Sequence, residues 1–431
     1  MTTDSSSPAR EPAMIKGIKG VKDILPDQID RWLLIENSAR RYARLYGFRE
    51  IRLPIFEVTE LFARSIGATT DIVEKEMYTF TDRDGTSLTL RPEGTAGAVR
   101  SYIEHNLGAS PVPQKLFYLG PMFRHERPQA GRLRQFHQFG VEFLGVAAPE
   151  ADVEVLSLLW RFFHALRLPG LTLELNTLGE TEDRPRYKKV LRDFLETKKS
   201  ALCANCQRRL ETNPLRVLDC KVPGCREATA DAPSIIDHIS PWARDHFEAV
   251  EAGLSAINIP FSLNPRLVRG LDYYTLTTFE VTCTHLGAQN AVGAGGRYDG
   301  LVEVLGGAPT PAIGFAVGLE RIALLLPEDA IAQPTPSVYV AGFGCDGART
   351  AYPLLDSLRQ AGVEATCDYR SATLKAHLRQ ADRLHCSHTL IIGDDEVTKG
   401  MAILRNMVSK VQEQIPLSSL VRDVAARLLN V

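Results

Sequence analysis

The sequence has 431 residues, of which 44% are hydrophobic and 24% are charged, as is usual for globular proteins that fold in water. The formal net charge of −2 excludes a uniformly basic coat for nucleic acid, but it allows local basic patches that bind phosphates. No apolar run approaches the roughly 20 residues that span a bilayer, and the N-terminal stretch lacks the apolar core of a signal peptide. We therefore expect a soluble, cytoplasmic protein of two or three domains with no membrane partner.

The N-terminal part of the sequence predicts a tail, a helix and a strand. Residues 1–13 are expected to form a short disordered tail. Apolar residues recur at helical spacing over residues 29–46, with Asp27 as the expected N-cap. Residues 48–53 then favour a short strand, which the following proline ends.

Two hairpins follow in the sequence. The first joins residues 77–81 to residues 87–91 through the turn Asp-Arg-Asp-Gly. The second, longer hairpin joins residues 115–126 to residues 133–145 through the polar loop 127–132. Strands joined by turns rather than by crossover helices indicate an antiparallel sheet.

The rest of the sequence indicates further domains. Residues 181–259 are charged, helical in pattern and contain cysteines, and strand patterns resume after them, so a domain is inserted into a continuing sheet. The stretch AQPTP at residues 332–336 is typical of a linker. Residues 337–431 alternate strand and helix, which predicts a compact α/β domain with a largely parallel sheet. The expected fold class is α+β and multidomain.

One face of the longer hairpin gathers polar and aromatic side chains. Because residues two apart on a strand share a face, the pattern places together Arg124, Glu126, Arg134, Phe136, Gln138 and Glu142. A solvated face of an antiparallel sheet is one interpretation. The other is a binding site, in which an arginine holds a phosphate, the ring stacks on a base and the carboxylates accept N–H groups.

The strings around this face carry a family resemblance. The string Phe123-Arg-His-Glu126 resembles motif 2 of class II aminoacyl-tRNA synthetases, and Gly318-Leu-Glu-Arg321 resembles their motif 3. The N-terminal helix, the strand after it and Pro54 resemble motif 1, the element that forms dimers in these enzymes. All three motifs occur in the order that the class requires.

Two further strings narrow the resemblance. The strings RGLDYY at residues 269–274 and GGRYDG at residues 295–300 resemble the two histidine signatures of histidyl-tRNA synthetases. The segments LTLRPEGTAG, GPMFRHERPQAGR, RQFHQFGVE and TNPLRVLD resemble bacterial members. From residue 14 to the C-terminus, the chain is identified as a member of the bacterial histidyl-tRNA synthetase family.

The resemblance implies a domain order and an activity. A class II catalytic domain, with an antiparallel sheet and flanking helices, would span residues 14–180 and 260–331. An inserted, mainly helical domain would span residues 181–259, and an α/β anticodon-binding domain would span residues 337–431. The implied reaction is ATP-dependent activation of L-histidine to histidyl-adenylate and its transfer to the 3′ end of histidine tRNA. Its products are AMP and diphosphate, and the enzyme would be a homodimer.

The resemblance also implies the ATP-binding and catalytic residues. Arg124 would hold the α-phosphate of ATP, which enters with Mg²⁺. The adenine would lie between Phe136 and Arg321, with Glu126 near its amino group. Arg269 would lie across the α-phosphate and stabilise charge as the phosphorus becomes five-coordinate. Arg269 and Arg124 are therefore the expected catalytic residues.

The implied histidine site combines a carboxylate and a phenol at the imidazole. Neutral imidazole offers one N–H donor and one acceptor, which Glu142 and Tyr274 would complement. Of the other residues, Glu93 and Thr95 would hold the α-amino group, and Gln138 would adjoin the amino and carboxylate groups. The full expected set is Glu93, Thr95, Arg124, Gln138, Glu142, Arg269, Tyr273, Tyr274 and Tyr298. Core packing is the alternative role of Tyr273 and Tyr298.

The loop of the longer hairpin is the expected contact with the tRNA acceptor stem. Gln129 can donate and accept hydrogen bonds at a base edge, whereas Arg127 and Arg132 would bind phosphate. An ordinary flexible hairpin loop is the alternative. In the C-terminal domain, a helical stripe of Lys375, Arg379 and Arg383 either contacts phosphates or is a solvated face.

Four cysteines cluster in the inserted domain. Cys203 and Cys206 are separated by two residues, and Cys220 and Cys225 by four. Two such pairs suit a structural, tetrahedral Zn²⁺, with free thiols as the alternative.

Two other functions fit parts of the pattern. One is the non-catalytic, synthetase-like regulatory subunit of ATP phosphoribosyltransferase, and the other is a synthetase for proline, threonine or glycine. The former typically lacks the C-terminal domain and has degraded ATP motifs, whereas both are intact in this sequence. The string RGLDYY argues against the latter.

Overall fold

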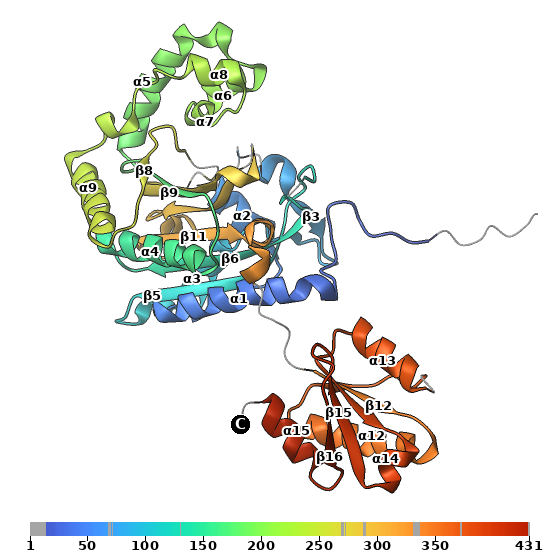
Figure 1. Ribbon diagram of the computed structural model, residues 1–431. Helices are drawn as coiled ribbons and strands as arrows, with labels where there is room; N and C mark the ends of the chain where they lie inside the picture. Colours follow the sequence, from blue (N-terminus) through green and yellow to red (C-terminus); the bar gives the residue numbers. More distant parts are fainter. Residues whose placement is uncertain are drawn as a thin grey trace, which may run out of the picture. The chain divides into compact units, whose positions relative to one another are not determined.

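The computed structural model describes residues 14–67, 70, 72–129, 131–268, 271, 273–287, 290–330, 337–370 and 373–429. The predicted tail at residues 1–13 and the linker at residues 332–336 lie outside this part of the chain. The chain divides into two compact units, Met1–Ile331 and Ala332–Val431, drawn from blue to orange and from orange to red in Figure 1.

An eight-stranded, mostly antiparallel sheet is the centre of the first unit. Among the described residues its strands, from one edge to the other, are β1 (Arg49–Glu50), β5 (Gln114–Phe123), β6 (Gln135–Leu144), β11 (Ala312–Gly318), β10 (Ala291–Arg297), β9 (Thr275–Cys283), β7 (Leu171–Thr177) and β8 (Ser262–Leu263). Only the two edge pairs, β1 with β5 and β7 with β8, are parallel. The predicted strand over residues 48–53 is therefore shorter than expected, because only two of its residues pair with β5.

A smaller sheet and short helices lie beside the large sheet. The small sheet has the order β2 (Phe56–Val58), β4 (Ser87–Leu90) and β3 (Tyr78–Thr81), so the predicted first hairpin is formed by β3 and β4. The adjoining helices are α2 (Thr59–Ile66), α3 (Thr95–Glu104) and α10 (Leu301–Val304). Single-turn helices of 3₁₀ or π type lie at Ile72–Glu76, Leu107–Ala109, Thr284–Leu286 and Glu328–Ala330.

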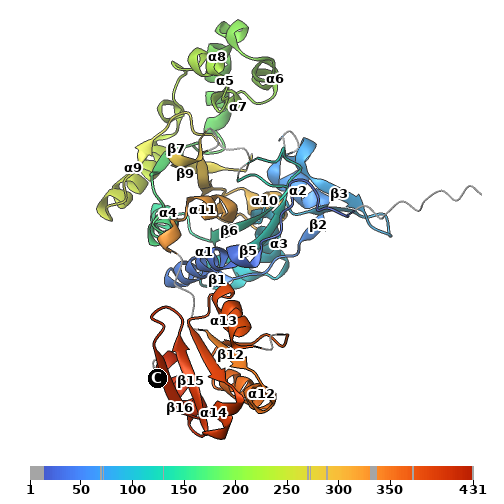
Figure 2. The same ribbon diagram turned by 45° about the vertical axis from the view of Figure 1, so that its right-hand side comes forward.

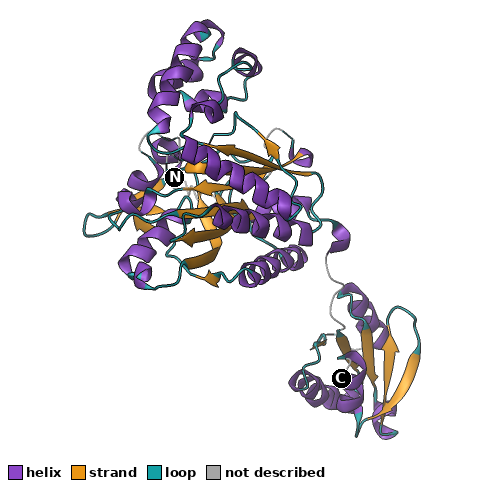
Figure 3. Ribbon diagram, turned by 90° about the vertical axis from the view of Figure 1, so that its left-hand side faces the viewer, coloured by secondary structure: helices purple, strands orange, loops and turns teal. Residues whose placement is uncertain are grey.

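Longer helices cover one face of the large sheet, as Figure 3 shows. They are α1 (Pro26–Leu45), α4 (Pro149–Ala165), α9 (Pro241–Ala256) and α11 (Leu319–Leu325). Phe139 and Val141 of β6 point into the core beneath these helices and are fully buried, as the alternation along the strand predicts. These helices do not cover the opposite face of β6, which carries Phe136 and Gln138 and borders a cavity. No helix in the described part of the chain is long and apolar enough to cross a membrane.

Helix α1 begins two residues earlier than its sequence suggests. Pro26 is its first residue and Leu25 occupies the N-cap position, with no side-chain hydrogen bond to the helix. The expected N-cap role of Asp27 is wrong, because Asp27 lies inside the first turn. Proline is well suited to the first helical position, since its fixed φ is already helical and the missing N–H would have no partner there.

The segment predicted as an insertion is helical. It contains α5 (Asp183–Thr197), α6 (Ala204–Thr212), α7 (Leu215–Leu218) and α8 (Pro223–Ala228), which form one helical group in Figure 2, with 3₁₀ turns at Lys199–Ala201 and Ile235–His238. Helix α9, which ends the segment, packs on α4. Its Phe247, Val250 and Leu254 belong to the same core as β6.

The second unit is an α/β sheet with a mixed strand order. Its elements are β12 (Val338–Gly342), α12 (Cys345–Gln360), β13 (Ala365–Thr366), α13 (Leu374–Arg383), β14 (His388–Ile392), α14 (Asp394–Thr398), β15 (Met401–Asn406), β16 (Gln412–Pro416) and α15 (Leu420–Leu428). The order is β13-β12-β14-β15-β16, and β14, β15 and β16 pair antiparallel. The expected largely parallel sheet is wrong for this half, because a short turn joins β15 directly to β16.

Candidate functional site

A cavity of about 270 Å³ opens on the uncovered face of β6 and its neighbours. Most of the predicted substrate-binding residues line it. They are Glu93, Thr95, Arg124, Glu126, Arg132, Phe136, Gln138, Tyr273, Tyr274, Tyr298 and Arg321. Segments that are far apart in the sequence supply them, namely β6, the loop before α3, the loop before β9 and the start of α11.

Glu142 lies directly behind Thr95 and Tyr298, which line this cavity, and it is 1% exposed. Thr95 donates its hydroxyl to Glu142 Oε1 at 2.7 Å, and Tyr118 donates to the same oxygen at 3.2 Å. Tyr298 donates to the other oxygen, Oε2. Burial raises the pKa of Glu142 to about 8, although these hydroxyls partly oppose the shift. A carboxyl group that titrates near neutral pH can therefore exchange a proton with a bound imidazole.

Tyr118 is a site residue that the sequence analysis missed. Its phenol reaches Glu142 from β5, where Tyr118 pairs with Gly140 of β6. A Cβ atom at Gly94 or at Gly140 would collide with the ring of Tyr118. The glycine within the string QFGVE was the available signal, since a glycine inside a strand marks close approach by another group.

Glu93 is held by the start of helix α3. Its carboxylate accepts the backbone N–H groups of Thr95 and Ala96 at 2.7 and 2.9 Å, and the residue is 4% exposed. Burial raises the pKa of Glu93, while these two hydrogen bonds act in the opposite direction. The helix start thus fixes a carboxylate at the wall of the cavity, where an ammonium group would pair with it.

Gln138 presents an acceptor to the cavity. It is 9% exposed, and in the described part of the chain its Oε1 has no hydrogen-bond partner. A buried carbonyl oxygen without a partner is costly, so this atom is suited to an N–H group of a ligand. Tyr273 and Tyr274 form the adjoining wall, with ring centroids 4.7 Å apart.

Cationic and aromatic groups form the outer part of the cavity. The Arg124 guanidinium lies 5.4 Å from the centre of the Phe136 ring, and its Nε donates to the carbonyl of Pro92 at 2.8 Å. Glu126 pairs with Arg132 at 3.0 Å and lies 3.9 Å from Arg124. This region offers a ring face and forked donors, the groups that a nucleoside and its phosphates require.

Two residues of the predicted motif 3 have different roles: Glu320 joins two elements of the fold, and Arg321 lines the cavity. Glu320 accepts the backbone N–H of His137 at 2.9 Å and contacts its Nδ1 at 3.0 Å, so α11 is tied to β6. The next residue, Arg321, lines the cavity and donates to the carbonyl of Ala291. Burial lowers the pKa of Arg321, and the nearby Arg132 acts in the same direction. Glu320 was also missed as a positioning residue.

Comparisons with known proteins agree with this arrangement. A family model described as histidyl-tRNA synthetase matches residues 20–322, and one described as an anticodon binding domain matches residues 338–427. The histidine–tRNA ligase of Desulfatibacillum aliphaticivorans is 53% identical over 418 residues, which cover 97% of this chain and 100% of the relative. That of Syntrophotalea carbinolica is 50% identical over 406 residues, which cover 94% and 97%. The chain belongs to the histidyl-tRNA synthetase family.

A solved structure supports the same family and the predicted fold class. Apo histidyl-tRNA synthetase from S. aureus has a TM-score of 0.80 with this chain at 39% identity, and the match covers 96% of this chain and 100% of that one. The antiparallel-rich sheet and the C-terminal sheet unit confirm the expected α+β fold. The match of residues 338–427 and the high identity to histidine–tRNA ligases argue against a regulatory subunit and against synthetases for other amino acids.

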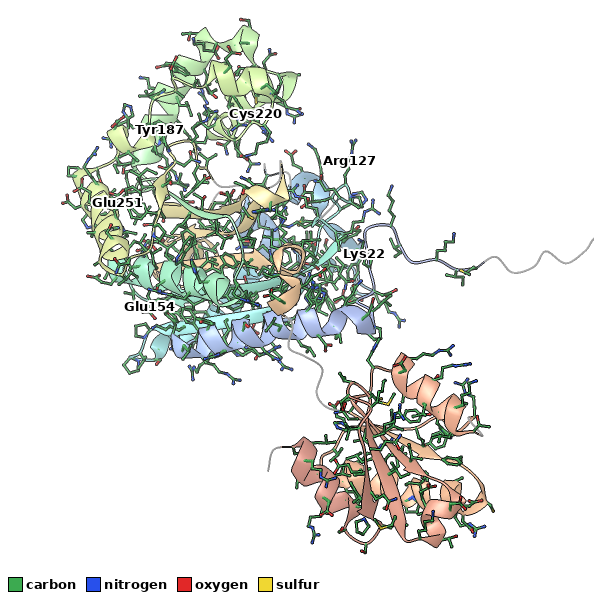
Figure 4. The ribbon with its side chains drawn as sticks, viewed as in Figure 1. Lys22, Arg127, Glu154, Tyr187, Cys220 and Glu251 are labelled. Carbon is green, nitrogen blue, oxygen red and sulfur yellow. The ribbon has the colours of Figure 1, made fainter. Side chains whose placement is uncertain are left out.

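The structure describes the expected tRNA-binding loop in part. Gln129 and Arg132 exchange backbone hydrogen bonds of 3.0 and 2.9 Å, which close a tight turn at the tip of the loop. The side chains of Gln129 and Arg127 are exposed, and Figure 4 labels Arg127. Arg132 instead turns toward Glu126 and the cavity. Gln129 and Arg127 thus do not line the cavity, whereas Arg132 does.

The four clustered cysteines converge in space. Their sulfur atoms all lie within 4.8 Å of one another, on and beside α6 and α8. The backbone N–H of Cys203 donates to Cys225 Sγ at 3.1 Å. The pKa of Cys203 is lowered to about 7, chiefly by the backbone N–H of Cys206. Cys220, labelled in Figure 4, lies within the same helical group.

Arg269 lies outside the described residues, as does Asp272 of the same string. The nearest described residues of that string, Leu271 and Tyr273, line the cavity. Arg297 of the second histidine signature has another role. It is fully buried and its Nε pairs with Asp152 at 2.9 Å, behind the sheet. Arg297 therefore fixes β10 against α4 and does not face the cavity.

Proposed function

We propose that this chain is a histidine–tRNA ligase that activates L-histidine with ATP and transfers it to the 3′ end of histidine tRNA, with AMP and diphosphate as products. The buried Glu142, held by three hydroxyl groups directly behind the cavity wall, is the observation that carries the proposal. A carboxyl group with a pKa of about 8 suits a ligand whose own side chain titrates near neutral pH.

Isotope exchange between ATP and pyrophosphate tests this activity without tRNA. We expect exchange with histidine and none with the other amino acids, because analogues that lack the ring nitrogens leave buried polar groups without partners. Exchange with proline, threonine or glycine in place of histidine would overturn the proposal.

The cavity suggests how histidine is held. The imidazole would lie on Glu142 and near Tyr274, with Tyr298 and Tyr273 closing the pocket around it. The α-amino group would pair with Glu93, whose carboxylate the start of α3 holds in place. Thr95 donates its hydroxyl to Glu142. Thr95 would therefore link the imidazole end of the histidine site to the end that holds the α-amino group.

Gln138 and Arg124 would act where the amino acid meets ATP. The free Oε1 of Gln138 would accept an N–H of the α-amino group, and Arg124 would bind the α-phosphate and the histidine carboxylate. The histidine carboxylate attacks the α-phosphorus and pyrophosphate leaves. A fixed guanidinium stabilises the negative charge that builds up in this step.

The outer part of the cavity would take ATP, which enters as its Mg²⁺ complex. Adenine would lie between the Phe136 ring and Arg321, with Glu126 accepting its amino group. Arg124 lies over the Phe136 ring, so the guanidinium would move from the ring to the phosphate when adenine stacks. Arg132, which already pairs with Glu126, would then face the phosphates.

We further propose that Arg269 is a catalytic residue that lies across the α-phosphate. Arg269→His should lower the exchange rate about 10²-fold, because a shorter and partly neutral side chain stabilises the transition state less. Thermal unfolding of the variant serves as the control for folding. Unchanged turnover at normal stability would remove Arg269 from this role.

The four converging cysteines support a structural zinc site. A tetrahedral ion with Zn–S bonds of about 2.3 Å needs sulfur atoms about 3.8 Å apart, which fits within the 4.8 Å span of this cluster. Burial raises the pKa of Cys206 and of Cys225, whereas that of Cys203 is lowered, so the support for zinc is the convergence of the four sulfur atoms. The ion would fix α6 and α8, with the adjoining turns, within the inserted domain at residues 181–259.

The molecule is also proposed to act as a cytoplasmic homodimer on tRNA. Helix α1 of motif 1 leaves Ile29 and Leu33 exposed, and β2, which follows Pro54 in the chain, leaves Phe56 and Val58 exposed. The loop at residues 127–132 would read the acceptor stem, with Gln129 at a base and with Arg127 and Arg132 at phosphates.

A further inference from the structure

Tyr298 stands in the wall of the catalytic cavity with almost no exposure to water. It is 1% exposed, and its phenol donates to Glu142 Oε2, whereas Thr95 and Tyr118 both donate to Oε1. The ring of Tyr298 meets that of Tyr273 edge to face, with 5.7 Å between the ring centroids. A small change in the direction of the Tyr298 side chain would therefore remove one hydrogen bond from the carboxyl group and leave the other two in place.

The residues on either side of Tyr298 are bonded to each other. Arg297 Nη1 donates to Asp299 Oδ1 at 3.3 Å, and the same oxygen accepts the backbone N–H of Ala312 at 2.9 Å. The carbonyl of Ala312 in turn accepts the backbone N–H of Tyr298 at 2.9 Å. The chain before, at and after Tyr298 is thus tied to one residue of β11.

Arg297 is anchored behind the sheet, on the side away from the cavity. It is fully buried, and its Nε pairs with Asp152 of α4 at 2.9 Å. Its Nη1 and Nη2 donate to the carbonyls of Val146 and Ala148, each at 3.0 Å, in the segment that leads into α4. A planar guanidinium reaches acceptors in several fixed directions, which the single ammonium group of a lysine cannot do.

The positive charge of Arg297 belongs to a buried group of charges. Burial raises the pKa of Asp152 to about 7, and Arg297 is the main cause that opposes this shift. His246 of α9 lies 3.4 Å from the same Asp152 oxygen, but burial lowers the pKa of His246 to about 4, so it is neutral at neutral pH. Loss of the charge at Arg297 would leave Asp152 buried without a cation, and a useful variant keeps that charge.

An irregularity in the large sheet lies at the same place. The register of β10 against β9 shifts between Gly296 and Arg297, and Thr275 Oγ1 of β9 accepts the backbone N–H of Asp299 at 3.4 Å. Bulges are frequent next to active sites, where they redirect a side chain, and they interrupt the backbone hydrogen bonds of the sheet. The side-chain contacts of Arg297 and Asp299 therefore have more influence on the direction of Tyr298 than they would in a regular strand.

We propose that Arg297 and Asp299 are positioning residues for histidine recognition, which act from behind the sheet by directing the Tyr298 phenol at Glu142. The inference rests on the proposed function, in which Glu142 binds the imidazole. Arg297 is fully buried and does not face the cavity, so its effect on histidine must pass through Tyr298.

The test measures exchange between ATP and pyrophosphate by the full-length enzyme, with separate KM values for histidine and for ATP. Tyr298→Phe should raise the KM for histidine about 10-fold, because a hydrogen bond to a carboxyl group is lost. Arg297→Lys keeps the charge but loses the forked donors, so it should also raise the KM for histidine about 10-fold. The KM for ATP should change less than about twofold in both variants, since the Tyr298 phenol contacts the residue assigned to the imidazole.

Asp299→Asn is a second variant, which disturbs the buried charges less. The Asp299 side chain is 30% exposed, and the asparagine oxygen can still accept the backbone N–H of Ala312. The variant lacks the negative charge that attracts Arg297, so it should raise the KM for histidine about threefold, less than the loss of a full charge-assisted hydrogen bond. Thermal unfolding of each variant shows whether the fold is intact.

A double-mutant cycle separates positioning from general support of the fold. Arg297→Lys added to Tyr298→Phe should raise the KM for histidine no further than Tyr298→Phe alone, because no phenol is left to direct. Arg31→Lys is the matched control. Arg31 also donates to two backbone carbonyls, of Ala323 at 2.8 Å and of Leu326 at 3.3 Å, but it joins α1 to α11. Its effect, alone or with Tyr298→Phe, should be that of an independent site.

The pH profile adds a readout that a loss of stability alone would not change. Burial raises the pKa of Glu142 to about 8, and the Tyr298 hydrogen bond opposes this shift. Without that bond the pKa rises further, so the alkaline rise in the KM for histidine should move to higher pH in Tyr298→Phe and in Arg297→Lys alike. The other titratable groups that face Glu142, which are Glu93, Tyr118 and Tyr273, are unchanged in these variants.

The outcomes separate this inference from the function on which it rests. A wild-type enzyme without histidine-dependent exchange overturns the proposed function. Normal wild-type exchange, with Arg297→Lys and Tyr298→Phe effects that multiply or with both KM values raised alike in Arg297→Lys, overturns the positioning role alone. An alkaline rise that stays at its wild-type pH in Arg297→Lys does the same. If Arg297→Lys does not fold, Asp299→Asn decides by the same criteria.

Discussion

At the scale of single residues, one buried carboxyl group and its neighbours lie directly behind the wall of the cavity. Glu142 accepts hydroxyl groups from Thr95, Tyr118 and Tyr298, and it is almost fully buried. Burial raises its pKa to about 8, so Glu142 and an imidazole can share one proton. Alternation along β6 predicted that Glu142 faces the site. The tyrosines that hold it were not predicted as its partners.

The shared proton makes histidine binding depend on pH in both directions. Below about pH 6.5 free histidine is protonated, and binding must release a proton, so affinity falls as the pH falls. Above about pH 8, Glu142 is ionised in the enzyme without histidine. Histidine binding must then take up a proton, so the affinity for histidine falls as the pH rises. We expect the lowest KM for histidine between these two values.

Glu142→Gln isolates the alkaline part of this profile. The variant should raise the KM for histidine about 10- to 100-fold and the KM for ATP far less, because only the imidazole loses its carboxyl partner. The alkaline rise in KM should also disappear, since glutamine does not titrate. A Gln variant that keeps the alkaline rise would assign it to the histidine α-amino group instead.

At the scale of elements, backbone hydrogen bonds close the loop between β5 and β6, and its two arginine side chains differ in exposure. The bonds between Gln129 and Arg132 close the turn, and Arg132 also pairs with Glu126 in the cavity. The sequence assigned both arginines to phosphate. The structure separates them, because Arg127 is exposed whereas Arg132 pairs with Glu126 and lines the cavity.

This separation gives the tRNA prediction. Relative to exchange, Gln129→Ala should lower charging kcat/KM of the normal transcript about 10-fold, since a base contact contributes roughly that factor. The loss should shrink on a transcript without the extra 5′ guanine of histidine tRNA. Arg127→Ala should reduce charging of both transcripts alike and flatten its salt dependence. Equal losses for Gln129→Ala on the two transcripts would contradict base reading.

The cysteine cluster gives a second prediction for an element of the fold. Purified protein should contain one zinc ion per chain, and Cys206→Ser should lose it and lower the midpoint of thermal unfolding, because ion binding contributes to folding. Cys386→Ser is the matched control, since Cys386 is also buried but lies in the other unit. Metal analysis that finds no zinc in freshly purified wild-type protein would favour free thiols.

At the scale of the whole molecule, the apolar surface of motif 1 predicts self-association. Light scattering should give about 95 kDa, twice the chain mass of 47.6 kDa. Phe56→Glu should shift the mass toward one chain, because Phe56, two residues after Pro54 of motif 1, is 53% exposed and a charge buried at a dimer contact is costly. Leu384→Glu, at 48% exposure in the C-terminal unit, should leave the dimer intact. A fully active wild-type monomer would contradict this prediction.

Much of the fold followed from local patterns, and its errors were local as well. The antiparallel hairpins and the helical segment at residues 181–259 follow from the spacing of apolar residues, which can be recognised within a short stretch of sequence. The start of α1 was placed two residues late, because Pro26 takes the first helical position and leaves Asp27 inside the first turn. The C-terminal sheet is only half parallel, since the turn between β15 and β16 carried a weak sequence signal.

The sequence by itself determined the family, the order of its motifs and the face of β6 that bears Phe136, Gln138 and Glu142, because strings and alternation are properties of adjacent residues. Only the tertiary structure decided which groups meet. Tyr118, Thr95 and Tyr298 reach Glu142 from positions 24, 47 and 156 residues away. Strand register and the missing side chains of Gly94 and Gly140 allow this approach. Such contacts depend on how distant strands pair, which no local pattern in one sequence specifies.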